Sequence, residues 1–148
     1  MAADVRLLLV PFDPAREAAA FTARHPEAGG VVSFLGQVRA GGGCEALELS
    51  HFEPLTLPGM QDLAASALNR WQLDGMLIIH RAGVMLPGEP IVLVAAAARH
   101  RRDAFAAADF AMDHLKSESW FWKREKTGGQ WHWIEPREED RQDLSRWG

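Results

Sequence analysis

The sequence predicts a compact α+β domain of antiparallel hairpins with about three helices, and three observations lead to this prediction. Short β-branched or apolar runs, which are typical of strands, are bounded by glycine- and proline-containing turns. Between them lie stretches whose apolar residues recur at helical spacing. No internal repeat, low-complexity segment or linker divides the 148 residues, a length that suits one hydrophobic core. We therefore expect a single domain over residues 1–148.

The first half of the chain predicts a strand, a helix and a hairpin. Residues 5–10 form an apolar run typical of a strand. Asp13 followed by Pro14 is typical of a helix cap and first turn. Residues 29–39 predict a strand that leads into a glycine-rich loop. Residues 45–52 alternate well enough to be its hairpin partner.

The second half predicts two more helices, a strand pair and a final hairpin. Apolar residues at helical spacing over 63–71 follow a Pro-Gly pair and predict an amphipathic helix. Two apolar strands, 75–84 and 90–98, flank a turn that contains proline and glycine. A helix over 100–116 follows. The tryptophan-rich segment 120–133 then predicts a hairpin with Thr-Gly-Gly as its turn.

Composition excludes several classes of protein. A net charge of −4 and a pI near 5.8 argue against nucleic-acid binding, which usually needs a basic domain. The single cysteine, Cys44, excludes a disulfide framework or a thiolate zinc site, and the histidines have no metal-ligand spacing. The N-terminus does not resemble a signal peptide, and no apolar stretch is long enough to span a bilayer. We expect a soluble, cytoplasmic protein that binds neither nucleic acid nor membrane.

A cluster of cations lies where a buried strand leads into the third predicted helix. Arg99, His100, Arg101 and Arg102 place positive charge at a helix N-terminus, where the helix dipole disfavours it. A bound anion would remove this conflict by accepting hydrogen bonds from backbone N–H groups and guanidinium groups. A solvated turn balanced in part by Asp103 explains the cluster equally well. The cluster alone therefore leaves both interpretations open.

Lys116 ends the same helix, beside the apolar stripe that the helical spacing predicts. That stripe consists of Ala104, Phe105, Ala108, Ala111, Met112 and Leu115. The aliphatic stem of Lys116 can lie on apolar surface while its ammonium stays at a rim. A lysine that simply favours a helix C-terminus through the dipole is the simpler interpretation of this position.

The final hairpin has two different faces. Trp120, Trp122 and Arg124 point one way, and Phe121, Lys123 and Glu125 point the other way. Trp131 and Trp133 share a face on the returning strand and can pair across it with aromatic residues. Because the chain is acidic and has no basic groove, packing is a better explanation of these tryptophans than base stacking.

Arg39 ends an earlier strand and is followed by a loop of glycines through which a ligand can approach the backbone. On spacing alone, an ordinary hairpin loop is the simpler interpretation. Cys44 lies in this loop, and no candidate base lies near it in the sequence, so we treat it as a bystander.

Four segments taken together resemble the large, catalytic subunit of molybdopterin synthase. They are VVSFLGQVR (31–39), IIHRAGVMLPGEPIVLVAAAARHRRDAF (78–105), MDHLK (112–116) and FWKRE (121–125). The likeness runs in register over nearly the whole chain. The joint occurrence of the histidine–arginine pair, the helix-ending lysine and the FWKRE hairpin is specific, whereas any one of them alone is a weak signal. The resemblance implies a fold of the α/β-hammerhead type.

This resemblance implies an enzyme, a sulfurtransferase of molybdenum cofactor biosynthesis. In that family the large subunit forms a homodimer, and each copy binds a small ubiquitin-like sulfur carrier, which gives a heterotetramer. The C-terminal Gly-Gly thiocarboxylate of the carrier enters the large subunit and sulfurates cyclic pyranopterin monophosphate. Two such transfers form the dithiolene of molybdopterin. No cofactor and no metal of its own are expected for the large subunit.

The resemblance also assigns roles to residues. Lys116 and Lys123 match the two active-site lysines of the family and are expected to be catalytic. We expect Arg39, His100 and Arg101 to form the phosphate site. The family's pocket draws residues from both subunits of the dimer. The residues expected to bind the substrate are Gln37, Val38, Arg39, His100, Arg101, Lys116, Lys123, Arg124, Glu125 and Arg137.

Two other classes of function are weighed against this one. A non-catalytic module that binds a ubiquitin-like partner or a phosphorylated ligand would use the same cations, but it would not need two converging lysines in an anion pocket. An RNA-binding domain would use the tryptophan–arginine hairpin, and its binding would depend steeply on salt. The acidic pI predicts no such binding.

Overall fold

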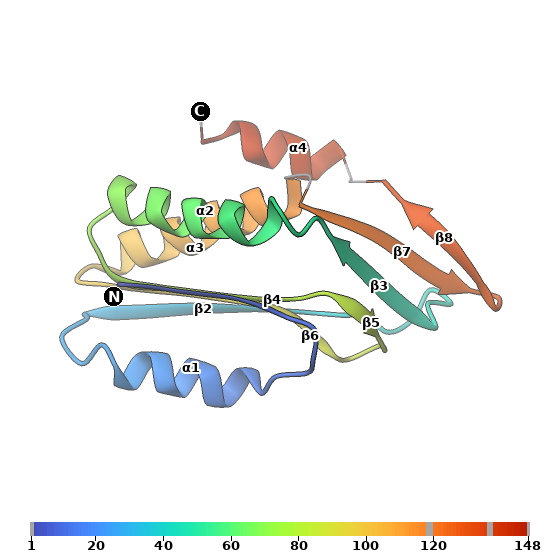
Figure 1. Cartoon of the computed structure of the whole chain (residues 1–148). Helices are drawn as coiled ribbons and strands as arrows, with labels where there is room; N and C mark the ends of the chain where they lie inside the picture. Colours follow the sequence, from blue (N-terminus) through green and yellow to red (C-terminus); the bar gives the residue numbers. More distant parts are fainter. Residues whose placement is uncertain (1, 118–119, 136–137, 148) are drawn as a thin grey trace.

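The computed structural model describes residues 2–117, 120–135 and 138–147, and within these ranges the chain forms two four-stranded sheets and four helices (Figure 1). Sheet A has the order β1 (Ala3–Leu8), β4 (Leu73–Arg81), β6 (Pro90–Ala98) and β2 (Gly30–Gln37). Sheet B has the order β5 (Gly83–Met85), β3 (Ala46–His51), β7 (Phe121–Thr127) and β8 (Gln130–Ile134). The helices are α1 (Pro14–Ala23), α2 (Thr56–Arg70), α3 (Arg101–Ser117) and α4 (Glu138–Ser145). The α+β prediction is confirmed.

Strand β6 lies at the centre of sheet A because its apolar residues leave it no exposed side. Residues 91–98 are all buried, so both edges of the strand need a partner and both faces need cover. Strands β4 and β2 pair with its two edges, both antiparallel to it. Strand β1 adds to β4 in the parallel direction. Helix α1 covers one face of the sheet, and α2 and α3 cover the other (Figure 1).

The predicted hairpin between residues 29–39 and 45–52 is wrong. Strand β2 pairs with β6 along its whole length, and β3 instead pairs with β5 and β7 in sheet B. Pairing of β2 with the second edge of the buried strand β6 is more favourable than the local hairpin that the short connection between β2 and β3 would allow. The predicted strand pair around the turn and the final hairpin are confirmed, and Gly128 and Gly129 both adopt positive φ in the hairpin turn.

Helix α3 packs on the sheet through alanines. Ala104, Ala107 and Ala111 are fully buried, and their small side chains let the helix approach closely. The predicted apolar stripe is partly wrong, since Phe105 is 60% exposed while Phe110 is only 3% exposed. The buried face is therefore rotated away from Phe105, because a phenylalanine there would hold the helix off the alanine-rich surface of β6.

The beginning of β7 is fixed by α2. The Thr56 hydroxyl donates to the Trp120 carbonyl at 2.7 Å and accepts from the Phe52 N–H at 2.9 Å. The Trp120 ring packs directly on Gly59, where a Cβ atom would come within 2.5 Å of the indole. A side chain at that glycine would therefore displace Trp120 and the strand that follows it.

Helix α4 was not expected from the sequence, because its residues are largely charged and none of them is buried. Its C-terminal end is held instead by Trp147, whose Nε1–H donates to the Asp113 carboxylate at 2.6 Å. The same carboxylate accepts from Arg146, and Arg70 donates to the Trp147 carbonyl at 2.8 Å. These contacts fasten the end of the chain to α2 and α3.

Replacing Thr56 with valine keeps the side chain's shape and removes the hydroxyl that joins Phe52 to Trp120. We expect the free energy of unfolding to fall by about 1–2 kcal/mol, because the Phe52 N–H and the Trp120 carbonyl each lose their shorter hydrogen bond and keep only the direct one of 3.4 Å between them. Thr22→Val is the matched control, since the Thr22 hydroxyl donates to Ala18 on the exposed side of α1 and its loss should cost at most about 0.5 kcal/mol. Urea unfolding measures both variants. Equal, small changes would contradict the role given to Thr56.

Candidate functional site

Four elements end or begin where the strands of sheet A meet sheet B, at the C-terminal ends of β2 and β4. This region, called the junction below, comprises residues 37–39 at and after the end of β2, 80–81 at the end of β4, Lys116 at the end of α3, and 121–125 of β7. Helix α3 follows β6 and runs back along the sheet, which brings its C-terminus to this region (Figure 1). The register agrees, since Gln37 pairs with Pro90 at the start of β6.

His80 lies at the centre of the junction and is buried. Its ring stacks on that of Phe121 with centroids 4.0 Å apart and planes 16° from parallel. Its Nδ1 lies 2.8 Å from the Arg81 carbonyl and donates to it. Burial lowers the pKa of His80 to about 4; the hydrogen bond to Arg81 opposes this shift, and the positive charge of Lys116 adds to it. The ammonium of Lys116 therefore lies near enough for its charge to affect this ring.

Lys123 projects from β7 on the same face as Phe121 and Glu125. Its Nζ lies 3.7 Å from the Glu125 carboxylate, and its side chain is 45% exposed. Lys116 is also exposed, and it lies in the last turn of α3, where the helix dipole favours a cation. Lys123 thus follows Phe121 by two residues on the same face of β7, and Lys116 lies at the end of the helix whose C-terminus reaches the junction.

The segment before the glycine loop is held by a turn at residues 86–89. The N–H of Val38 donates to the Glu89 carbonyl at 2.9 Å, and the Gly88 N–H donates to the Val38 carbonyl at 2.8 Å. The Glu89 carboxylate accepts from the buried Arg81 guanidinium at 3.1 Å. Val38 is buried in the core, whereas Gln37 and Arg39 on either side of it are exposed. Arg39 is therefore presented at the junction by a fixed backbone.

Arg124 points away from Lys123, to the opposite face of sheet B. It donates to the Glu48 carboxylate and lies over the rings of Trp131 and Trp133, 4.6 and 5.6 Å from their centroids. The tryptophans thus pair across the hairpin with this guanidinium, and not with aromatic residues as the sequence suggested. These contacts make Arg124 a support of the hairpin within one chain.

His100 and Arg101 lie at the opposite end of the strands of sheet A, just after the C-terminal end of β6. Strand β2 begins beside them, since Gly30 pairs with Ala98 and a Cβ at Gly30 would lie 3.3 Å from the Arg101 Cα atom. At a rise of about 1.5 Å per residue, Arg101 and Lys116 stand about 22 Å apart along α3. One chain therefore does not bring His100 and Arg101 to Arg39 or to the lysines. Arg137 lies outside the described residues.

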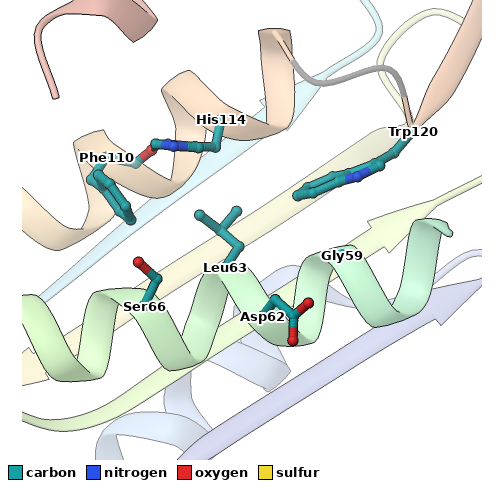
Figure 2. A pocket seen from close by; sticks show the side chains of 7 residues that line it. All are labelled: Gly59, Asp62, Leu63, Ser66, Phe110, His114 and Trp120. Carbon is teal, nitrogen blue, oxygen red and sulfur yellow. Dashed lines mark hydrogen bonds between the residues drawn. The ribbon is translucent and has the colours of Figure 1, made fainter. Parts of the chain in front are cut away.

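Two of the surface pockets formed by the described residues can be compared with the predicted site, and no predicted site residue lines either of them. The first, of about 340 Å³, lies between α2 and α3, with Phe110 and Trp120 at its two ends (Figure 2). Its lining residues are Gly59, Asp62, Leu63, Ser66, Phe110, His114 and Trp120. The second, of about 360 Å³, is lined by Leu7, Leu9, His51, Glu53 and Leu57.

Metal binding and membrane spanning find no support in the structure. Among the described residues, no three or more histidine, cysteine, aspartate or glutamate side chains are grouped so that they could hold a metal ion. In the same part of the chain, no helix is long and apolar enough to cross a membrane.

The family model described as MoaE protein matches residues 10–118. The chain belongs to the MoaE family. A molybdopterin synthase catalytic subunit from Ralstonia nicotianae is 42% identical over 147 residues, which cover 97% of this chain and 84% of the relative. The resemblance inferred from the four sequence segments is confirmed. Because its relatives are named catalytic subunits, this MoaE chain belongs to a family of enzymes.

Solved MoaE structures share the fold. The molybdopterin biosynthesis MoaE protein from Burkholderia ambifaria has a TM-score of 0.83 at 40% identity, covering 98% of this chain and 97% of that one. A molybdopterin synthase from Staphylococcus aureus has a TM-score of 0.77 at 26% identity, covering 87% and 95% of the two chains. The two-sheet arrangement that forms the junction is therefore the MoaE fold.

His80 should make the stability of the protein depend on pH. Because burial holds the pKa of folded His80 at about 4, below its ordinary 6.5, the unfolded chain binds more protons between these values, and stability falls as the pH drops through them. Wild type should lose up to about 3 kcal/mol more than His80→Phe between about pH 7 and pH 4. Urea unfolding across this range measures the difference. Parallel pH dependences would contradict the assignment.

Proposed function

We propose that this chain is the catalytic subunit of a molybdopterin synthase and acts as a sulfurtransferase. It transfers sulfur from the C-terminal thiocarboxylate of a small ubiquitin-like carrier to cyclic pyranopterin monophosphate, which forms the dithiolene of molybdopterin. The observation that carries the proposal is the position of His80, which stacks on Phe121, two residues before Lys123, and whose pKa is lowered in part by the charge of Lys116. The names of the relatives agree with this activity.

The two lysines provide the chemistry that such a transfer needs. Once the thiocarboxylate sulfur has bonded to a carbon of the substrate, water replaces it at the carrier's terminal carbonyl and leaves a carboxylate. Negative charge develops on the carbonyl oxygen during this attack, and an ammonium placed beside it stabilises that charge. Opening of the cyclic phosphate ester requires a group that moves protons, a role that a lysine at a partly desolvated site can fill. Glu125, 3.7 Å from the Lys123 ammonium, holds that side chain in place and balances its charge. Arg39 adds a cation for the substrate's phosphate.

The phosphate site is completed by a second copy of the chain. His100 and Arg101 are exposed and lie about 22 Å from Lys116, at the end of α3 where backbone N–H groups and the helix dipole favour an anion. In a symmetric homodimer, residues at one end of α3 can face the junction of the partner subunit. Each pocket would then combine the lysines of one copy with the cations of the other.

The other assigned residues take supporting parts. Gln37 lines the pocket beside Arg39, and Val38 anchors that segment through its buried side chain and its backbone hydrogen bonds. Arg124 stiffens the hairpin from its outer face. We also propose Arg137 as a substrate-binding residue, on the sequence resemblance alone.

The assembly is a homodimer that binds one carrier per subunit, with residues 1–148 acting as one domain. We place it in the cytoplasm, because the chain has one cysteine and so no internal disulfide, as is typical of proteins from a reducing compartment. The activity is tested by incubating the protein with thiocarboxylated carrier and cyclic pyranopterin monophosphate and following dithiolene formation. Absence of dithiolene with a carrier that binds would reject the function.

Replacing Lys116 or Lys123 with alanine should abolish most of the activity and leave the fold intact. Both side chains are exposed, so melting temperatures should change little, whereas turnover should fall about a hundredfold or more. Arginine at either position should restore the rate only in part, because guanidinium stays protonated and has another shape. Lys126→Ala is the matched control, since Lys126 lies on the same strand with its side chain on the opposite face. Single-turnover transfer at saturating carrier and substrate measures each variant.

The shared pocket predicts that two inactive variants restore each other. Lys123→Ala and Arg101→Ala should each be inactive as homodimers. After the subunits are mixed and allowed to exchange, each mixed dimer has one intact pocket, so about a quarter of the wild-type activity should return. If the lysine and the arginine of one pocket came from the same copy, every pocket in the mixture would carry one defect. Mixing would then restore nothing, and the two-copy site would be wrong.

A further inference from the structure

His80 connects the two elements that carry the lysines. Its ring stacks almost parallel on Phe121, the second residue before Lys123 on β7, at 4.0 Å. The ammonium of Lys116, at the end of α3, lies close enough to act electrostatically on the same ring. A single buried side chain therefore packs on the strand that carries Lys123 and lies within electrostatic reach of Lys116.

The protonation of this ring is fixed by its surroundings. Because a carbonyl only accepts, the contact between His80 Nδ1 and the Arg81 carbonyl places the proton on Nδ1 and leaves a lone pair on Nε2. Burial keeps the pKa of the ring at about 4, so it is uncharged at neutral pH. An uncharged imidazole with a free lone pair attracts a neighbouring ammonium, whereas a charged one would repel it.

Packing alone does not account for a histidine here. The two preceding residues of β4 that face α2 and α3, Met76 and Ile78, are fully buried and apolar. An apolar side chain at position 80 would continue this row without burying a polar ring, which costs free energy unless its groups are paired. The choice of histidine thus points to a role for its nitrogens.

We propose that His80 is a positioning residue for the lysine pair: its uncharged ring fixes the start of β7 by stacking on Phe121, and its Nε2 lone pair holds the ammonium of Lys116 at the junction. The inference rests on the proposed function, because it concerns how the two lysines are held for sulfur transfer. His80 itself does not touch the reacting atoms in this scheme.

The chain offers a matched control in His114. Its Nδ1 lies 2.9 Å from the Phe110 carbonyl, and its ring lies 4.3 Å from that of Phe110. It therefore has the same kind of hydrogen bond and the same kind of aromatic neighbour as His80. His114 lines the pocket between α2 and α3 (Figure 2), whereas the ring of His80 stacks on Phe121 of β7.

The test is a double-mutant cycle of His80→Phe and Lys116→Arg, measured by single-turnover sulfur transfer from thiocarboxylated carrier. His80→Phe keeps a ring for Phe121 and removes both nitrogens. It should lower the rate at saturation about tenfold, leave the half-saturating concentrations unchanged, and cost less than about twofold once Lys116 is arginine. His80→Gln, which restores a polar acceptor, should recover part of the rate. His114→Phe should stay within about twofold of its parent in both backgrounds.

The rates of these variants separate a failure of the role proposed for His80 from a failure of the proposed function. A rate for folded His80→Phe within about twofold of wild type overturns the proposal, and so does an equal loss in both backgrounds, which would make the effect independent of Lys116. If melting curves show that His80→Phe does not fold, His80→Met, which also removes both nitrogens, takes its place in the cycle under the same criteria. Normal rates for both Lys116→Ala and Lys123→Ala would instead reject the proposed function, so the two failures are told apart.

Discussion

The burial of β6 on both faces and both edges is the constraint on which the rest of the structure depends. A strand with no exposed side must have two neighbouring strands and two covering layers, and β4, β2 and the helices on either face meet that demand. Because α3 follows β6 directly, it must run back along the strand. The first residues of α3 then lie near the C-terminal end of β6, and Lys116 lies near the N-terminal end of that strand.

The junction exists because sheet B is joined to sheet A through a few specific contacts. One half of a sheet B face, at Leu47, Leu49 and Met85, is buried and continues the core of sheet A. The other half of that face carries Lys123 and Glu125, which are not covered by the core. The proposed reactive surface is thus the part of this face of sheet B that extends beyond the hydrophobic core.

The sequence predicted those elements whose signals are local. The apolar runs of β4 and β6, the spacing in α3 and the glycines of the last turn all lie within the elements they define. The pairing of β2 was missed because it depends on the second edge of β6, whose backbone hydrogen bonds β2 completes. Helix α4 was missed because Trp147 holds it from outside its own span. The role of His80 depends on a stack with a residue far along the chain, which no local pattern reveals.

The alanine contact between α3 and β6 has a consequence for how the enzyme tolerates change. Where methyl groups alone separate a helix from a sheet, the distance between them is as short as packing permits, and any enlargement must move the helix. Ala104 lies near the N-terminus of α3 and Lys116 near its C-terminus. A bulkier side chain at position 104 would tilt the helix and so displace Lys116. Substitutions remote from the chemistry, with only modest effects on folding, can thus become defects of catalysis.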